Sequence, residues 1–375
     1  MADLFLYGTL CHVPLLEVVL GRPAAQIDMA PATLDGHGVW WVSDHAFPMI
    51  AEAASGQAQG LILRSLSATD VARLDFYEGG FDYALQDVAV ASCGGSHAAQ
   101  VYFPAPGRWQ AGAPWSLSDW VARWGAMTLS AAQEVMAQFG LMPVEEVRAL
   151  WPFFCARGWA QQLAAVPAPQ TLRSQMGMKD VNVLRYRAGY NGFFRIKAFD
   201  LQHRRFDGGL SDVVSREAYV AFDAALVLPY DPVTDQVMLI EQLRYGPVHR
   251  GDPAPWVLEP IAGLVDAGED PADCARREAV EEAGLTLAEV RPMLRVYPSP
   301  GYTTEFFHCF LGLCALAKRD EGLNGVAAEN EDIRSHVIPF DAAMALVDSG
   351  EINVGPLVTM LLWLARRRSD LRAAA

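Results

Sequence analysis

The sequence is poor in cysteine, and its few cysteines form no pattern. They are scattered, without a Cys-x-x-Cys pair or a partnering histidine pattern, at Cys11, Cys93, Cys155, Cys274, Cys309 and Cys314. Zinc sites and disulfide frameworks have recognisable spacings, and this chain shows none of them. We therefore expect ordinary buried thiols in the reducing cytoplasm.

A basic surplus and membrane-length apolar runs are also missing. The chain carries 29 Lys and Arg against 44 Asp and Glu, a net charge of −15. Such an acidic surface argues against binding nucleic acid through phosphate neutralisation. The opening MADLFLYGTL lacks the basic region and long apolar core of a signal peptide, and no apolar run is long enough to span a bilayer. We expect a cytoplasmic protein with neither a nucleic-acid nor a membrane partner.

The most informative segment is residues 263–285, GLVDAGEDPADCARREAVEEAGL. Its spacing, G-x5-E-x7-R-E-x-x-E-E-x-G, places seven residues: Gly263, Glu269, Arg277, Glu278, Glu281, Glu282 and Gly284. Asp270 and Pro271 suit the start of a helix, because Asp can cap free N–H groups and Pro has none to lose. Gly284 suits the left-handed residue that ends a helix. The segment therefore predicts a loop that leads into a helix.

Three glutamates of this helix, Glu278, Glu281 and Glu282, are spaced to share one face. Like charges that close repel by roughly a few tenths of a kcal/mol per pair, so a cation is expected nearby. Hard carboxylate oxygens suit Mg²⁺ or Mn²⁺, which proteins commonly hold together with substrate phosphates. The alternative, a solvated acidic helix face, does not account for the two glycines and the arginine at fixed positions.

The length of 375 residues predicts two or three domains. We expect a small mixed domain of short strands at residues 1–110. A helical extension and a proline-containing linker follow at 111–170. An α/β domain at 180–370 alternates strands and helices in the manner of an α/β/α sandwich. The expected fold class is therefore a two-domain α+β and α/β protein.

The carboxylate segment resembles the Nudix box, with Ala279 as a mild departure at a usually bulkier position. The resemblance extends over roughly residues 185–365 and is nearest to the ADP-ribose diphosphatase branch. It is carried by GFFR, HRRFDGG, SRE, LPYDP, IEQLR, SPGYTTE and ENEDI. It implies a metal-dependent hydrolase that cleaves the diphosphate of ADP-ribose to AMP and ribose 5-phosphate. It also implies a homodimer formed through this domain.

The resemblance assigns roles to individual residues. The metal ligands it implies are the carbonyl of Ala262 and the carboxylates of Glu278, Glu281 and Glu282. The base that activates water would be Glu329, with Glu331 as the runner-up. Arg277 is expected to pair with Glu269 or a neighbouring carboxylate and so to orient the cluster.

Substrate contacts are expected from three further residues. Arg216 and Arg244, on strand-like segments before the box, are candidates to hold phosphate or ribose oxygens in bidentate contacts. Phe193 matches an aromatic residue that stacks on adenine in the family, although a phenylalanine there is otherwise simply core.

The first 110 residues resemble the γ-glutamylcyclotransferase-like fold, a small mixed β-barrel with one pocket. The residues that carry the resemblance are YGTL, FP, GLIL, LDFYEGGFDY and VYFP. In that family the YGTL loop, here Tyr7, Gly8, Thr9 and Leu10, presents backbone donors to the substrate. Glu78 matches the general acid/base that drives release of 5-oxoproline from a γ-glutamyl compound. Ala84 stands where many relatives carry a basic residue after the tyrosine, so the domain is either active or retains the fold alone.

Other functions remain open at this point. The Nudix half is either an ADP-ribose diphosphatase, a hydrolase of another nucleoside diphosphate sugar or dinucleotide, or a sensor that binds ADP-ribose without turnover. The complete set of carboxylates argues against the sensor, because a sensor can lose its metal ligands without penalty. The combination of domains resembles proteins labelled as tellurite-resistance factors.

Overall fold

The computed structural model describes residues 2–79, 83–166, 168–316, 322–325 and 331–375. The chain forms two compact units, Met1–Pro167 and Ala168–Ala375. All six cysteines are free, and four of them are buried. Among the described residues, no helix is long and apolar enough to cross a membrane.

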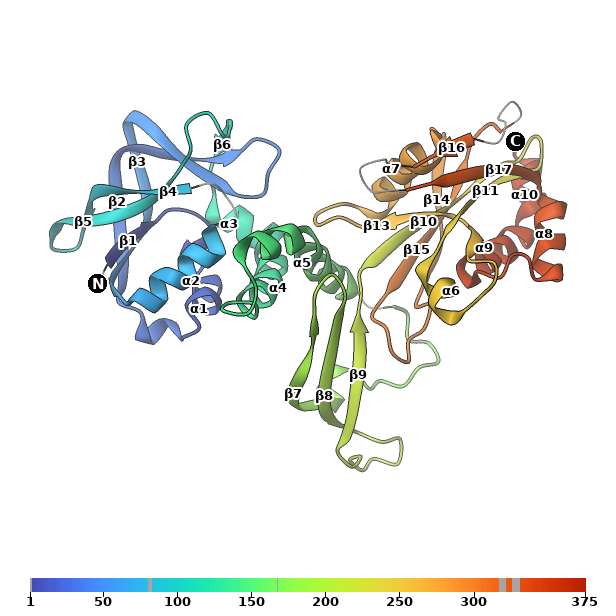
Figure 1. Ribbon diagram of the computed structural model, residues 1–375, viewed down its shortest axis with the longest axis horizontal. Helices are drawn as coiled ribbons and strands as arrows, with labels where there is room; N and C mark the ends of the chain where they lie inside the picture. Colours follow the sequence, from blue (N-terminus) through green and yellow to red (C-terminus); the bar gives the residue numbers. More distant parts are fainter. Residues whose placement is uncertain (1, 80–82, 167, 317–321, 326–330) are drawn as a thin grey trace. The chain divides into compact units, whose positions relative to one another are not determined.

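The first unit is a barrel of mixed strands followed by helices (Figure 1). Its strands are β1 (Ala2–Leu6), β2 (Met29–Val42), β3 (Pro48–Leu66), β4 (Tyr83–Ser92), β5 (Gly95–Pro104) and β6 (Ala111–Pro114). Its helices are α1 (Val13–Leu20), α2 (Ala68–Glu78), α3 (Leu117–Trp120), α4 (Ala126–Met136) and α5 (Val144–Ala164), with a π-helical stretch at Val121–Gly125 and short 3-10 turns at Thr9–Cys11 and Ala24–Gln26.

Five of these strands form a closed barrel. The order β3-β1-β5-β4-β2 returns to β3, with β1 and β5 parallel and the other pairs antiparallel. The barrel is filled by buried apolar side chains such as Phe5, Ile50, Ile62 and Val101. Gly60 permits this closure, because a Cβ there would lie 2.0 Å from the carbonyl oxygen of Leu6. The predicted small mixed barrel is confirmed.

Two features of the first unit differ from the sequence prediction. The strands predicted to be short merge into the 14-residue β2 and the 19-residue β3, because these two strands pair along nearly their whole length. The helices predicted as an extension pack within the first unit, α4 against α1 and against α5. A buried ion pair joins α4 to α5, with Glu134 Oε2 2.8 Å from Arg157 Nη2.

The second unit contains two sheets. Its strands are β7 (Val181–Asn191), β8 (Arg195–His203), β9 (Val214–Val220), β10 (Asp223–Asp231), β11 (Gln236–Leu243), β12 (Trp256–Glu259), β13 (Ile261–Leu264), β14 (Glu289–Val296), β15 (Phe306–Leu313), β16 (Gly322–Asn324) and β17 (Ile333–Pro339). Its helices are α6 (Tyr245–Arg250), α7 (Pro271–Ala283), α8 (Phe340–Ser349), α9 (Gly355–Ala365) and α10 (Arg368–Ala373), with a 3-10 turn at Met178–Asp180.

Strands β7, β8 and β9 form a three-stranded antiparallel sheet, and the remaining strands form an eight-stranded mixed sheet. The central β10 is buried along its whole length. Because side chains alternate across a strand, Leu226 and Leu228 of β10 face the helices α8 and α9, while Ala225 and Val227 lie on the other face, which α7 covers (Figure 1). Helices on both faces of one sheet confirm the predicted α/β/α sandwich.

Candidate functional site

The helix of the carboxylate segment begins and ends as its sequence predicts. The Asp270 carboxylate accepts a hydrogen bond of 2.8 Å from the Ala272 N–H, and Pro271 occupies the first helical position. Gly284 ends α7 in the left-handed conformation, with φ of 56°. Local sequence therefore fixes where this helix starts and stops.

Gly263 has a specific steric role beside α7. It lies on β13, and a Cβ there would lie 1.7 Å from the Oε1 atom of Glu278. Only glycine therefore lets the Glu278 side chain lie against the strand. The same strand holds a second glutamate, because the Ala262 N–H donates to Glu282 Oε2 at 2.9 Å.

Arg277 bonds three of the carboxylates. Its guanidinium lies 3.0 Å from Glu269 Oε1, 2.6 Å from Glu278 Oε1 and 2.9 Å from Glu281 Oε2. Hydrogen bonding to Glu269, followed by the charge of Glu278, raises the pKa of Arg277. The expected pairing of Arg277 with Glu269 is present, and it extends to two of the predicted metal ligands.

Glu282 is buried and Glu278 is partly buried, and both have a raised pKa. Glu282 is only 2% exposed, and burial raises its pKa to about 8, with the charges of Glu278 and Glu331 acting in the same direction. Burial likewise raises the pKa of Glu278 to about 7, against the opposing charge of Arg277. Both acids hold their protons more tightly than exposed glutamates, as expected for carboxylates without enough nearby positive charge.

The atoms of this site that could bind a metal are all oxygens, and the single charge of Arg277 does not neutralise the carboxylates. The site therefore suits a hard divalent cation. Within the described part of the chain, however, no group of three or more His, Cys, Asp or Glu side chains is already arranged as a metal site. The reason is visible at Glu278 and Glu281, whose carboxylates bond Arg277.

Arg244 acts on three acidic residues, two of which, Glu259 and Glu305, sequence reasoning did not single out. Its Nε donates to Glu259 Oε2 at 2.7 Å, and its charge lowers the pKa of both Glu282 and Glu305 against the raising effect of burial. Glu259 is the last residue of β12, and Glu305 is the last residue of the SPGYTTE segment. Neither residue has a local pattern that marks it, because the sheet alone brings them toward Arg244.

The two predictions for the base have different outcomes. Glu329 lies outside the described residues. Glu331 is described, and it is near enough to α7 that its charge contributes to the raised pKa of both Glu278 and Glu282, after burial.

Phe193 and Arg216 belong to the three-stranded sheet rather than to the sheet that carries β13. Phe193 lies in the turn between β7 and β8, is 42% exposed, and packs against Phe194 and Phe222 with ring centroids 4.8 and 6.1 Å away. Arg216 lies on β9, where its Nη1 donates to the carbonyl oxygen of Ser215. Phe222 directly precedes β10, so Phe193 packs beside the start of the central strand.

A second group of titratable residues lies in the first unit. Glu78 ends α2, and burial raises its pKa to about 7. Burial, and to a smaller extent the charge of Glu78, also raises the pKa of Tyr7, Tyr83 and Tyr102. The charge of Glu78 therefore acts on three phenol groups.

The YGTL segment contains one of these tyrosines, Tyr7. Tyr7 follows β1 and its hydroxyl donates to the Tyr102 carbonyl at 3.0 Å. A Cβ on Gly8 would lie 2.8 Å from Pro48, so glycine permits this close approach. Thr9 begins the 3-10 turn, in which Leu10 is buried.

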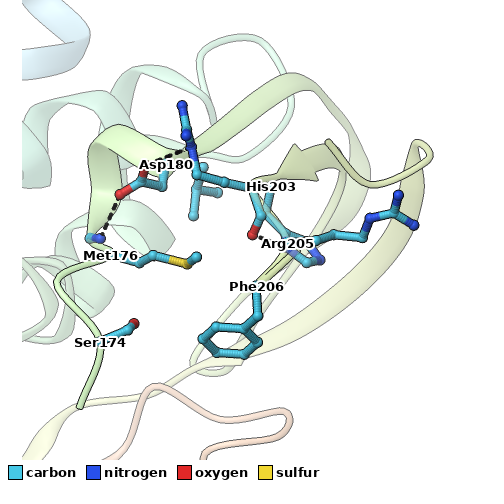
Figure 2. Close-up of a pocket in the computed structure, with 9 residues that line it drawn as sticks. Ser174, Met176, Asp180, His203, Arg205 and Phe206 are labelled. Atoms are coloured by element: carbon cyan, nitrogen blue, oxygen red, sulfur yellow. Dashed lines mark hydrogen bonds and ion pairs between the residues drawn. The ribbon is translucent and has the colours of Figure 1, made fainter. Parts of the chain in front are cut away.

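One cavity of the second unit lies on other residues. It has a volume of about 540 Å³ and is lined by Met176, Asp180, His203, Arg205 and Phe206 among others, as Figure 2 shows. None of the predicted site residues lines it. Two arginines line it, Arg204 and Arg205, and Arg204 forms an ion pair of 3.3 Å with Asp180. The cavity is therefore separate from the carboxylate site.

Comparison with known proteins identifies both units. The NUDIX domain family model matches residues 221–357, and the model "Gamma-glutamyl cyclotransferase, AIG2-like" matches residues 4–122. The ADP-ribose pyrophosphatase of Escherichia coli (strain K12) is 39% identical over 204 residues, which are 54% of this chain and 97% of that protein.

The chain is also similar to a second named enzyme and to one solved structure. The GDP-mannose pyrophosphatase of Escherichia coli (strain SMS-3-5 / SECEC) is 36% identical over 149 residues, 40% of this chain and 76% of that protein. A solved structure described as an ADP compounds hydrolase is 20% identical, with a TM-score of 0.41, and covers 52% of this chain and 97% of its own. With a relative matched over nearly its full length at 39% identity, the chain belongs to the Nudix family, and its N-terminal unit carries a gamma-glutamyl cyclotransferase, AIG2-like domain.

Proposed function

We propose that the second unit hydrolyses the diphosphate of ADP-ribose to AMP and ribose 5-phosphate. The observation that carries the proposal is the pair of glutamates, Glu278 and Glu282, that α7 places against β13 beside Gly263 and Ala262. The choice of substrate draws on the relatives named ADP-ribose pyrophosphatase, which this chain matches over nearly their whole length.

Glu278, Glu281, Glu282 and the carbonyl of Ala262 would hold Mg²⁺ or Mn²⁺. The bound cation would neutralise charge on the diphosphate and lower the pKa of a water molecule. Arg277 orients Glu278 and Glu281, and Gly263 leaves the space that Glu278 needs. The raised pKa of Glu282 favours a cation at this site, since positive charge lets the buried carboxyl ionise.

Deprotonation of the attacking water is assigned to a glutamate of the ENEDI segment. Glu329 remains the first choice from family resemblance. Glu331 gains support from its electrostatic influence on Glu278 and Glu282. A base must lie within reach of the water it deprotonates, and Glu331 meets the weaker requirement of lying near the carboxylate pair.

Arg244, Arg216 and Phe193 would bind the substrate. The charge of Arg244 acts on Glu282 and Glu305, which favours contact with phosphate or ribose oxygens beside the metal ligands. The half-exposed ring of Phe193 offers a face to adenine. Arg216 projects from an exposed strand position, where its guanidinium can form a bidentate contact.

We also propose that the protein is a homodimer formed through the second unit. Strand β7 is exposed along most of its length and carries Leu184, Tyr186 and Tyr190, which are 46%, 65% and 62% exposed. Apolar side chains in that number on one strand favour a protein interface. Size-exclusion chromatography with light scattering should give twice the chain mass, and a mass of one chain at micromolar concentration would contradict the dimer.

The substrate proposal is tested with purified protein, Mg²⁺ and a panel of ADP-ribose, GDP-mannose, other nucleoside diphosphate sugars and dinucleotides. AMP should appear from ADP-ribose with the highest kcat/KM. Cleavage of another member of the panel with ADP-ribose left intact would transfer the proposal to that substrate. Binding without turnover of any member would support a sensor.

A second activity is favoured by the first unit. We propose that Glu78 serves a γ-glutamylcyclotransferase reaction, supported by its pKa of about 7 and by the tyrosines around it. The α-amine of the γ-glutamyl group attacks the γ-carbonyl, forming the ring C–N bond of 5-oxoproline and breaking the original amide bond. Glu78 takes a proton from the attacking amine and returns it to the amine that leaves. The test measures by chromatography the release of 5-oxoproline from γ-glutamyl dipeptides and from glutathione. If none of them releases 5-oxoproline, the first unit retains the fold of the family without its activity.

A cytoplasmic location is part of the same proposal. Its support is the six free cysteines, which suit a reducing compartment.

A further inference from the structure

The strand that carries Ala262 and Gly263 is held to its sheet along one edge. In the described part of the sheet, β13 pairs only with β10, from Ala224 opposite Leu264 to Val227 opposite Ile261. One further hydrogen bond, from the Val265 N–H to the Asp223 carbonyl at 3.0 Å, closes the ladder. The position of β13 therefore follows the position of the first residues of β10.

The chain just before β10 is hydrogen-bonded to the SPGYTTE segment. The chain passes from β9 to β10 over two residues, Ala221 and Phe222. The Tyr219 N–H donates to the Tyr302 carbonyl at 2.7 Å, and the Ala221 N–H donates to Thr304 Oγ1 at 2.9 Å. The SPGYTTE segment is thus joined to the end of β9 and to Ala221, directly before the central strand.

Asp223 connects β13 to β15, the strand that follows the SPGYTTE segment. Its carboxylate Oδ2 lies 2.7 Å from Nε2 of His308, on β15 three residues after Glu305, and each of the two residues is 5% exposed. Because a carboxylate can only accept, His308 Nε2 donates this bond. Asp223 therefore bonds the residue after β13 through its backbone and the strand after the loop through its side chain.

We propose that Asp223 and His308 are a positioning pair that keeps β13 in register with the SPGYTTE segment. Neither residue is among the proposed metal ligands or substrate contacts. They act through the backbone of β13, whose Ala262 N–H holds Glu282 and whose Gly263 accommodates Glu278. The inference rests on the proposed function to the extent that α7 and β13 must hold a divalent cation.

The test compares two amides at position 308. Gln places an amide nitrogen where Nε2 of histidine lies, whereas Asn ends one carbon earlier and cannot reach Asp223 without movement. Mn²⁺ affinity is measured without substrate, by electron paramagnetic resonance of free Mn²⁺, on the full-length chain. His308→Asn should weaken Mn²⁺ binding about tenfold, as is usual for residues that orient ligands indirectly, and His308→Gln should stay within about twofold of the wild type.

A control lies at the other end of the same strand. The Tyr230 hydroxyl donates to Asp235 Oδ1 at 2.9 Å, so Tyr230→Phe also removes a bond between a buried side chain and a carboxylate. It should lower Tm without changing Mn²⁺ affinity. An equal loss of Mn²⁺ affinity in Tyr230→Phe and His308→Asn would overturn the proposal, because the effect would then be general loosening of β10.

Other results bear on the positioning pair and on the proposed function. Wild-type affinity in His308→Asn, or equal losses in the Asn and Gln variants, would overturn the positioning role. ADP-ribose hydrolysis by the wild type is measured in parallel. Mn²⁺ binding without hydrolysis would refute the proposed function and leave the positioning pair to be judged by its affinities, whereas absence of Mn²⁺ binding in the wild type would overturn both.

Discussion

Each of the two units holds a glutamate with a raised pKa, but the side chains near the two glutamates differ. Glu282 of the second unit shares its helix face with other carboxylates, near Arg277 and Arg244. Glu78 of the first unit has tyrosines near it. Burial dominates the shift in both cases. Because burial is common to both glutamates, the side chains near each one distinguish a carboxyl group suited to binding a cation from one suited to exchanging a proton.

The largest expected effect is at Glu282. Glu282→Gln keeps the shape of the side chain but removes the charge that would face the cation. We expect kcat/KM for ADP-ribose to fall about a thousandfold, since charge stabilisation by a bound metal is worth several kcal/mol. Glu289→Gln, at an exposed strand position paired with Arg291, is the matched control and should keep full activity. Retained hydrolysis in Glu282→Gln would refute the metal assignment.

The next effect concerns the first unit alone. Glu78→Gln should reduce release of 5-oxoproline about a hundredfold to ten-thousandfold, because general acid–base catalysis contributes in that range. ADP-ribose hydrolysis by the same variant should be unchanged. If Glu78→Gln lowered both activities, the comparison between two independent sites would fail.

Gly263 tests whether close packing positions the metal ligands. Gly263→Ala would place a Cβ 1.7 Å from Glu278 Oε1, so the carboxylate must move. Misplacement of a reacting group by about 1 Å costs roughly a hundredfold, and kcat/KM for ADP-ribose should fall by that factor. Gly355→Ala, where a Cβ meets open space, is the control. Unchanged activity in Gly263→Ala would show that Glu278 does not need this position.

The smallest effect is on stability. The folded pKa of Glu78 is about 7, above the value of 4.5 for an exposed glutamate. The folded state therefore holds the proton more tightly, and stability falls as pH rises from about 4.5 to 7. Glu78→Gln avoids this loss, so at pH 8 it should exceed the wild type in unfolding free energy by about 1–3 kcal/mol, and the difference should shrink toward zero at pH 5.

The measurement is urea unfolding followed by tryptophan fluorescence, which reports mainly on the first unit because eight of the ten tryptophans precede residue 167. A Glu78→Gln variant no more stable than the wild type at pH 8 would contradict the raised pKa. Equal gains at pH 5 and pH 8 would point to packing instead of charge.

Much of the fold was accessible from sequence because its signals are local. Asp270, Pro271 and Gly284 fixed the ends of α7, and the alternation of strands and helices predicted the sandwich. The lengths of β2 and β3 were not accessible, since their extent depends on the partner strand with which each pairs. The packing of α4 and α5 within the first unit likewise depends on contacts such as Glu134 with Arg157.

By itself, the sequence determined the carboxylate set of α7, since residues three and four apart share a helix face wherever the helix lies. Tertiary structure alone decided which groups surround that set. Arg244, Glu259 and Glu305 come together because strands distant in sequence pair in one sheet, and Asp223 meets His308 across 85 residues. Burial, and hence the raised pKa of Glu282 and Glu78, also arises only when the chain packs, because desolvation depends on all the neighbours at once.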